Sequence, residues 1–164
     1  MTLRFEDLKV LQAAETIEDG IWKQVVRWDP FVRDTVGGQL AKAADSIGAN
    51  IAEAFGRFHY GEKVQFLYYS RGSLFETKFW LNRAQERGIM PSTQVQGYAS
   101  QLSELARQLN AFISKIKAQQ RSNQHKMKTE SDFPTTYMED QPIDKATPMF
   151  TEEEIKWLKT IPNT

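Results

Sequence analysis

Cysteine is absent from the 164 residues, and histidine is scarce, because His59 and His125 are the only two. The lack of cysteine excludes disulfide bonds, thiolate nucleophiles and cysteine-ligated metal sites. Neither histidine belongs to a Glu-x-x-His pair, which is the pattern that places di-iron ligands on the helices of a bundle. We therefore expect no metal ion and no other cofactor.

The sequence also lacks an excess of charge of either sign, since 21 Lys and Arg residues balance 21 Asp and Glu residues. The balance is uneven along the chain, because residues 1–121 hold 16 basic and 13 acidic side chains and residues 122–164 hold 5 and 8. No run approaches the roughly 18 apolar residues that cross a bilayer, and the start does not read as a signal peptide. These features predict a cytoplasmic protein with no membrane partner.

The clearest pattern that is present is helical periodicity. Apolar residues recur three and four positions apart in stretches at about 5–28, 31–55, 62–87 and 92–117, which we expect to be helices. Pro30, the segment GRFHYG (56–61) and Gly88 separate them, because proline and glycine commonly end helices. Four helices of similar length with short connections predict an all-α fold, an antiparallel up-down-up-down four-helix bundle over residues 1–120.

The remainder of the chain has a different composition. Residues 121–149 are polar and contain several prolines, which is typical of a flexible linker. Residues 150–161 regain an amphipathic pattern, with Thr151 and Glu154 at capping-box spacing, and predict a short amphipathic helix. We expect this C-terminal helix to dock on a protein partner, the alternative being an end that is disordered or docked on its own chain.

The second helical stretch is unusually rich in small residues. Glycine within a helix costs about 0.5–1 kcal/mol relative to alanine, so repeated small residues suggest close approach of another helix. One arc of this stretch is apolar and fits the bundle core, and a second arc carries few charges. We therefore expect an oligomer interface at Ala41, Gly48, Ala49 and Ala52, the alternative being an exposed alanine-rich helix.

Polar side chains on the second and third stretches predict a structural network. Arg71 borders the apolar face of the third stretch, where a partly buried guanidinium needs an acceptor, and Glu53 is the natural candidate. A ligand-binding or catalytic role for these side chains is the alternative. The expected members are Ser46, Asn50, Glu53, Arg71, Ser73 and Glu76.

Three segments, FEDLKV (5–10), SIGANIAEAFGR (46–57) and FLYYSRGSLFET (66–77), resemble the four-helix-bundle proteins encoded in intervening sequences of bacterial 23S ribosomal RNA genes. The resemblance covers about residues 4–118. Against the family pattern, Lys42 replaces arginine, Gly48 replaces proline, Ala54 replaces glycine and Ser70 replaces alanine. The resemblance implies a homopentameric ring with no enzymatic activity and no catalytic residue, and some relatives accompany a retroelement reverse transcriptase and bind nucleic acid.

These observations favour a non-enzymatic, oligomeric accessory protein that associates with RNA or with a reverse transcriptase. The candidate nucleic-acid contacts are Arg57, Lys63, Arg83 and Arg87, which assembly of a ring could gather into a basic belt. The alternative is a protein–protein assembly scaffold that binds no nucleic acid. A third possibility is an enzyme that uses Glu53 and Arg71.

Overall fold

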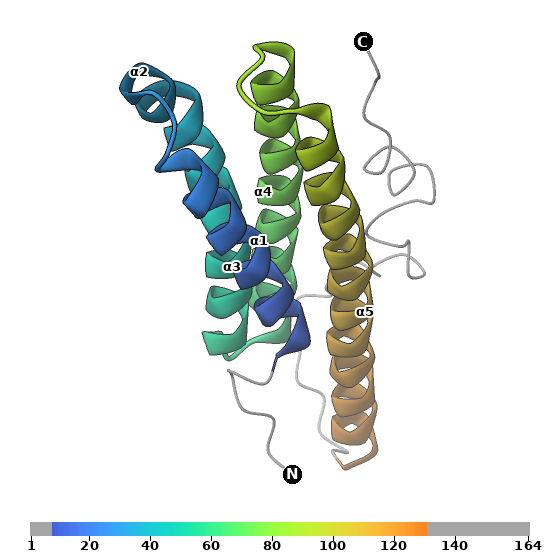
Figure 1. Ribbon diagram of the computed structural model, residues 1–164. Coiled ribbons are helices and arrows are strands. Elements are labelled where there is room, and N and C mark those ends of the chain that lie inside the picture. The colour runs from blue at the N-terminus through green and yellow to red at the C-terminus, as the bar shows by residue number, and fades with distance from the viewer. Residues whose placement is uncertain (1–7, 131–164) are drawn as a thin grey trace.

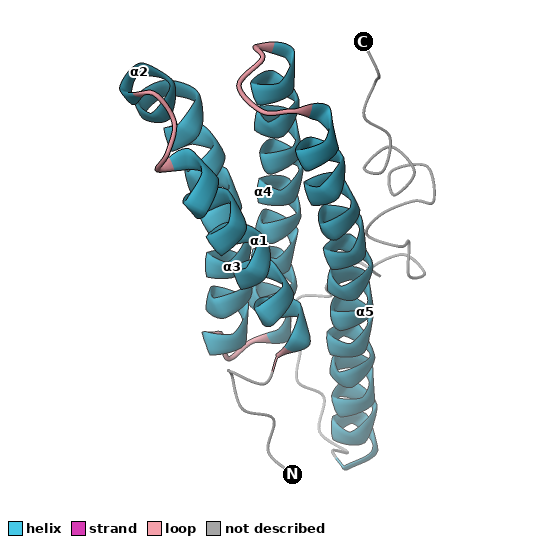
Figure 2. Cartoon of the chain, viewed as in Figure 1, coloured by secondary structure: helices cyan, strands magenta, loops and turns pink. Residues whose placement is uncertain are grey.

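The computed structural model describes residues 8–130, with side chains up to residue 123. Its helical elements are α1 (Lys9–Val25), α2 (Pro30–Val32), the π-helical turn η2 (Arg33–Gly37), α3 (Gly38–Gly56), α4 (Tyr60–Glu86) and α5 (Ser92–Glu130). Within these residues no strand occurs, and short loops join the helices (Figure 2). The predicted all-α fold is therefore confirmed.

The four long helices run alternately up and down and form a bundle (Figure 1). Each packs against two neighbours, since α3 contacts α1 and α4, and α5 contacts the same two helices. The short α2 and η2 continue directly into α3, so the second predicted helix is present with a π-helical turn near its start. We call the end of the bundle that holds residues 57–59, between α3 and α4, the α3–α4 end.

The helices begin and end at residues whose capping or backbone preferences can be read from the sequence. The Asp29 carboxylate accepts a hydrogen bond of 3.0 Å from the Phe31 N–H, and Pro30 occupies the first position of α2, where no donor is needed. At the same end of the bundle, where α4 turns into α5, Gly88 adopts a φ of 67°, and the Ile89 N–H donates to the Ala84 carbonyl. Gly88 ends α4 because glycine adopts this left-handed backbone conformation without steric cost.

The core consists of the apolar stripes that the sequence predicts. One stripe comes from each long helix, and the buried members include Ile17 and Ile21 of α1, Leu40 and Ile47 of α3, Leu67 and Leu74 of α4, and Leu102 and Leu105 of α5. Burying a Leu or Ile side chain stabilises a fold by roughly 1.5–3 kcal/mol, so this cluster supplies the main driving force for folding.

The last helix is longer than the sequence pattern predicts. α5 continues to Glu130 and runs past the lower ends of the other helices in Figure 1, so residues 121–130 are helical rather than part of a linker. The physical reason is composition, because residues 118–130 contain Ala, Gln, Lys and Arg and neither Gly nor Pro. The remainder of the predicted linker and the predicted helix over residues 150–161 lie outside the described residues.

Candidate nucleic-acid interface

A pocket of about 550 Å³ opens at the α3–α4 end of the bundle. The end of α3, the turn to α4, the first residues of α4 and the C-terminal half of α5 all contribute to it. Aromatic, basic and amide side chains line it together, namely those of Phe55, Phe58, His59, Tyr60, Lys63, Phe112, Lys115, Ile116, Gln119 and Asn123, with Ala54. Most of these residues belong to no motif of the sequence, and the fold alone brings them together.

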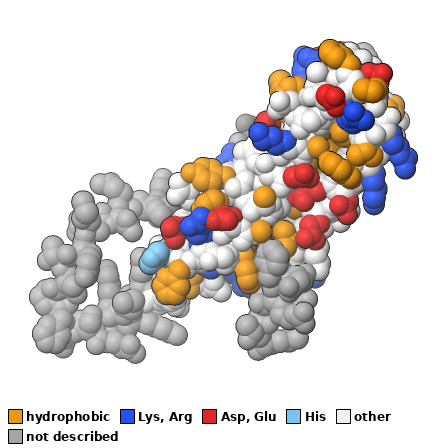
Figure 3. Space-filling model, turned by 90° about the vertical axis from the view of Figure 1, so that its left-hand side faces the viewer, with side chains coloured by type: hydrophobic (Ala, Val, Ile, Leu, Met, Phe, Trp, Pro, Cys, Tyr) orange, Lys and Arg blue, Asp and Glu red, His pale blue; other side chains and the backbone are white. Residues whose placement is uncertain are grey.

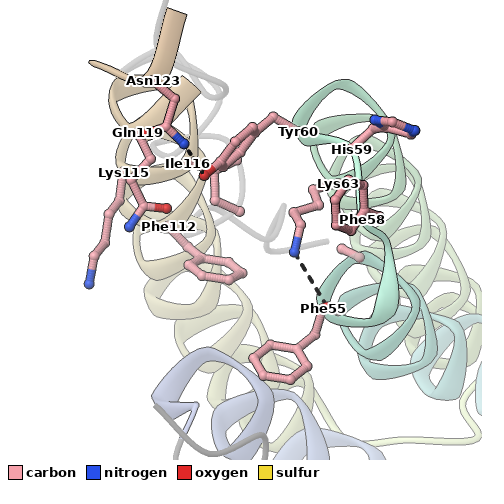
Figure 4. Close-up of a pocket in the computed structure, with 11 residues that line it drawn as sticks. Phe55, Phe58, His59, Tyr60, Lys63, Phe112, Lys115, Ile116, Gln119 and Asn123 are labelled. Atoms are coloured by element: carbon pink, nitrogen blue, oxygen red, sulfur yellow. Dashed lines mark hydrogen bonds between the residues drawn. The ribbon is translucent and has the colours of Figure 1, made fainter. Parts of the chain in front are cut away.

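The close-up of this pocket shows which side chains point inward (Figure 4). The rings of Phe55 and Phe112 lie near one another, and the Lys63 side chain reaches between α4 and the end of α3. The Tyr60 ring extends toward α5, where the Asn123 amide donates a hydrogen bond of 2.9 Å to the Tyr60 hydroxyl. The ammonium group of Lys115 points away from the pocket, into solvent.

Lys63 is the charged group inside the pocket. Its ammonium nitrogen lies 3.5 Å from the Phe55 carbonyl oxygen, which is at the outer limit of a hydrogen bond. An ammonium group has three donors, and a half-buried one benefits from a strong acceptor. The pocket therefore presents a cation that is well placed to bind an anionic group beside aromatic walls.

The C-terminal half of α5 extends the positive charge beyond the pocket. Residues 111–123 contain three basic side chains, Lys115, Lys117 and Arg121, and no acidic one, whereas Arg107 nearer the middle of α5 pairs with Glu104. Lys117 donates a hydrogen bond of 3.1 Å to the Tyr68 hydroxyl, and its ammonium lies 5.6 Å from the centre of that ring. Sequence reasoning missed Lys115, Lys117 and Arg121, although the local count of charges along α5 was a signal that could have found them.

The predicted basic belt of Arg57, Lys63, Arg83 and Arg87 does not form a single cluster within one chain. Arg57 and Lys63 lie at the α3–α4 end, whereas Arg83 and Arg87 lie at the opposite end of α4. Twenty residues of helix separate Lys63 from Arg83, which corresponds to about 30 Å at 1.5 Å per residue. Arg57 also pairs with Glu53, and Arg83 pairs with Glu86, so local acids offset both charges.

The predicted polar network is organised differently from the expectation. Glu53 forms its ion pair with Arg57, one turn along α3, whereas the Arg71 guanidinium lies 5.7 Å from the centre of the Phe75 ring. Ser46, Asn50 and Ser73 donate hydrogen bonds within their own helices, to the carbonyl groups of Lys42, Ser46 and Tyr69 respectively. Glu76 is exposed. The reason is that side chains four apart on one helix meet more readily than these groups meet across α3 and α4.

The four residues expected at an oligomer interface fall into two pairs. Ala41 and Gly48 are buried within their own chain, whereas Ala49 is exposed and Ala52 is half-buried. The close approach that Gly48 permits is made by α1 and not by a neighbouring subunit, because a Cβ atom at Gly48 would lie 2.4 Å from the Glu18 carboxylate. Ala41 and Gly48 therefore pack inside their own chain rather than at an oligomer interface. An interface at Ala49 and Ala52 remains a prediction.

Glu18 is the most strongly perturbed acid among the described residues. Its carboxylate accepts a hydrogen bond of 2.8 Å from the Gly48 N–H. Burial raises the pKa of Glu18 to about 7, and the nearby carboxylates of Asp45, Glu15 and Asp19 act in the same direction, against the Gly48 hydrogen bond. Acidic side chains are indeed grouped on the face of the molecule shown in Figure 3.

Lys78 is a buried cation that sequence reasoning did not single out. Its side chain is 1% exposed, and burial lowers the pKa of its ammonium group to about 8. It lies on α4 about one turn after Leu74 and one turn before Leu81, which are both fully buried. A lysine at a helix position next to an apolar stripe usually extends into solvent, so the sequence alone gave no reason to expect this burial.

Other site types find no support in the part of the chain that the structure describes. No group of three or more His, Asp or Glu side chains there is arranged to hold a metal ion. None of the helices between residues 8 and 130 combines the length and the apolar character needed to span a membrane.

The fold and this end of the molecule define an all-helical, four-helix-bundle protein with a basic, aromatic pocket at one end. The family model of the 23S rRNA-intervening sequence protein matches residues 6–111, and the chain belongs to this family. A comparison with curated proteins returned no match. The matched region spans α1 to α4 and much of α5, and it includes Phe55, Tyr60 and Lys63 of the pocket.

Proposed function

We propose that the protein is a non-enzymatic accessory protein that binds RNA through the α3–α4 end of the bundle. The observation that carries this proposal is the basic C-terminal half of α5, where Lys115, Lys117 and Arg121 occur without an acidic side chain between residues 111 and 123. RNA binding depends on such local clusters of cations, because each phosphate contact releases condensed counterions.

Aromatic groups beside this charge distinguish RNA from other anionic partners. Phe58 is 88% exposed, and its ring makes an edge contact with His59 at a centroid distance of 5.3 Å. A phenyl ring in water is costly to maintain without a partner, and bases of single-stranded nucleic acid stack on such rings. Membership in the 23S rRNA-intervening sequence protein family is consistent with an RNA-related role.

A salt titration of RNA binding tests the proposal. The full-length protein is titrated into a fluorescently labelled single-stranded RNA at several salt concentrations, with affinity measured by anisotropy. The affinity should fall steeply with salt. Substitution of Lys115, Lys117 and Arg121 by glutamine should reduce the slope of log affinity against log salt by about 0.7 for each lost phosphate contact, and hence by about 2 in total.

A matched variant controls for the change in net charge. Lys23, Arg27 and Arg33 are exposed and lie at the opposite end of the bundle, near α2. Their replacement by glutamine changes the net charge by the same amount and should leave the salt slope unchanged. Equal effects of the two triple variants would show that binding follows net charge alone, and a lack of binding at low salt would refute the proposal.

A protein–protein scaffold is the second candidate, and exposed apolar groups on α4 favour it. Tyr69 is 50% exposed and Phe79 is 51% exposed, although both are large apolar side chains in the middle of a helix. Exposed aromatic side chains are frequent at protein interfaces. We propose that they and the exposed side of α3 contact further copies of the chain in a homo-oligomer, for which a pentamer is the expected form. RNA binding and assembly are compatible.

A further inference from the structure

We propose that the pocket at the α3–α4 end binds one unpaired base of single-stranded RNA together with an adjacent phosphate. This inference rests on the proposed function and assigns it a specific site. The basic surface of α5 explains attraction to any polyanion, whereas the pocket provides walls, a cation and amides that a duplex could not reach. The occupant is therefore expected to be a nucleotide that is not base-paired.

The shape and lining of the pocket fit a flat aromatic group. Phe55, Phe112 and Tyr60 contribute rings from three different helices, and Ile116 adds an aliphatic surface. In Figure 4 the rings of Phe55 and Phe112 border the same space, which is open between α3 and α5. Its volume of about 550 Å³ lies in the range of 300–1,000 Å³ that is usual for small-molecule sites.

Polar groups inside the pocket match the remainder of a nucleotide. The Lys63 ammonium has the Phe55 carbonyl, at 3.5 Å, as its hydrogen-bond acceptor, so a phosphate oxygen would offer it a stronger one. Gln119 and Asn123 carry amides, which both donate and accept hydrogen bonds and so suit the edge of a base. The Tyr60 hydroxyl, which accepts from Asn123, fixes the orientation of one amide.

The electrostatic surroundings favour RNA over an acidic peptide. Cations lie in the pocket, at Lys63, and on the adjoining stretch of α5, at Lys115, Lys117 and Arg121, whose side chains leave that helix in different directions. A strand with regularly spaced phosphates is long enough to reach several of these positions around α5, whereas a short acidic peptide would use the nearest ones.

The test compares three RNA probes on the full-length protein at one salt concentration. The probes are a 12-nucleotide oligouridine, an abasic 12-mer with the same phosphates, and a 12-base-pair duplex. We expect the oligouridine to bind about tenfold more tightly than the abasic strand, because stacking of a base on aromatic rings contributes only when a base is present. Duplex RNA should show no such advantage over the abasic strand.

Two variants separate the pocket from the basic surface. Phe112→Leu keeps an apolar side chain but removes the ring, and it should reduce the preference for oligouridine over the abasic strand to about twofold. Lys115→Gln removes a charge that points away from the pocket, and it should weaken both strands equally while the preference remains. Circular dichroism establishes that each variant retains the helical content of the wild type.

Each result decides one of the two proposals. If all RNAs bind but the abasic strand binds as well as oligouridine, or if Phe112→Leu leaves the preference intact, the pocket inference is wrong and the proposed function stands. Failure of every RNA to bind at low salt would overturn both. Capture of a synthetic acidic peptide with the sequence of residues 150–161, in place of base-dependent RNA binding, would equally overturn the pocket inference.

Discussion

At the scale of single residues, Ile47 and Gly48 are distinctive because the peptide group that joins them forms hydrogen bonds with side chains of two other helices. The Ser70 hydroxyl of α4 donates to the Ile47 carbonyl at 2.9 Å, and the Gly48 N–H donates to the Glu18 carboxylate of α1 at 2.8 Å. Positions 48 and 70 are also two of the positions at which the sequence departs from the family pattern. Proline at 48 would remove the donor, and alanine at 70 would remove the hydroxyl, so both departures serve one contact.

The titration of Glu18 gives a testable effect of this contact on stability. The pKa of Glu18 is raised from 4.5 to about 7, so the folded protein favours the protonated carboxyl. The resulting stabilisation is fully present below pH 4.5 and is lost as pH rises to about 7 and above. We expect the Glu18→Gln variant to be more stable than the wild type at pH 8, by about 1–2 kcal/mol after allowance for solvent screening of this partly exposed group, because glutamine accepts the Gly48 hydrogen bond without a charge.

Urea unfolding of both proteins between pH 4.5 and 8 measures this effect. The difference between the two unfolding free energies should grow with pH across that window and level off above about pH 7. Carboxyl groups far from Glu18 titrate alike in both proteins and cancel in the difference, whereas Asp45, Glu15 and Asp19 interact with Glu18 and contribute to it. A difference that stays constant with pH would mean that Glu18 has an ordinary pKa in the folded state.

The sequence predicted part of this chemistry. Gly48 and its small neighbours predicted the close approach of a helix from a second subunit, whereas the group that fills the space at Gly48 is a side chain of the same chain. This side chain is that of Glu18, thirty positions earlier in the chain. Periodicity tells which face of a helix is buried, but it does not tell which long polar side chain from a neighbouring helix reaches that face, because this depends on the offset between the helices.

Among the helices, α3 is the one whose outer side is best suited to assembly. Ala49 is exposed and Ala52 half-buried, and neither position bears a side chain that would hinder close packing. We expect Ala49→Glu and Ala52→Glu to dissociate the homo-oligomer while each chain remains helical, since a buried unpaired carboxylate at an interface is costly. Size exclusion with light scattering gives the oligomer mass, and circular dichroism gives the helical content.

A matched substitution on α5 serves as the control for this experiment. Ala111 is also an exposed alanine within a helix, so Ala111→Glu adds the same charge at a distance from α3. It should leave the oligomer mass unchanged. A wild-type protein that is monomeric at micromolar concentration would contradict the assembly hypothesis, whatever the variants do.

The helix boundaries show where sequence reasoning succeeds and where it stops. Pro30 and Gly88 acted through local backbone geometry, and the breaks they predicted are present. The end of α5 was predicted too early, because the apolar periodicity ceases near Ile116, after which α5 meets α4 through polar contacts such as that of Asn123 with Tyr60. Beyond that point no core stripe is required, and helix-forming polar residues continue the helix to Glu130.

For the molecule as a whole, the dominant property is an asymmetric distribution of charge that the neutral total conceals. Glu15, Glu18, Asp19 and Asp45 are close enough on α1 and α3 for their charges to interact, whereas α5 is purely basic between residues 111 and 123. A polyanion is repelled by the first region and attracted by the second. The net charge of the sequence does not reveal this asymmetry, because the asymmetry depends on which helices are neighbours in the fold.

Photochemical cross-linking tests most directly whether RNA contacts the α3–α4 end. The full-length protein is irradiated with a single-stranded RNA that contains 4-thiouridine, and the cross-linked peptides are identified by mass spectrometry. The account predicts cross-links in residues 54–68 and 112–123, with few in α1 and α2. Cross-links concentrated near Lys23, Arg27 and Arg33, at the opposite end of the bundle, would contradict it.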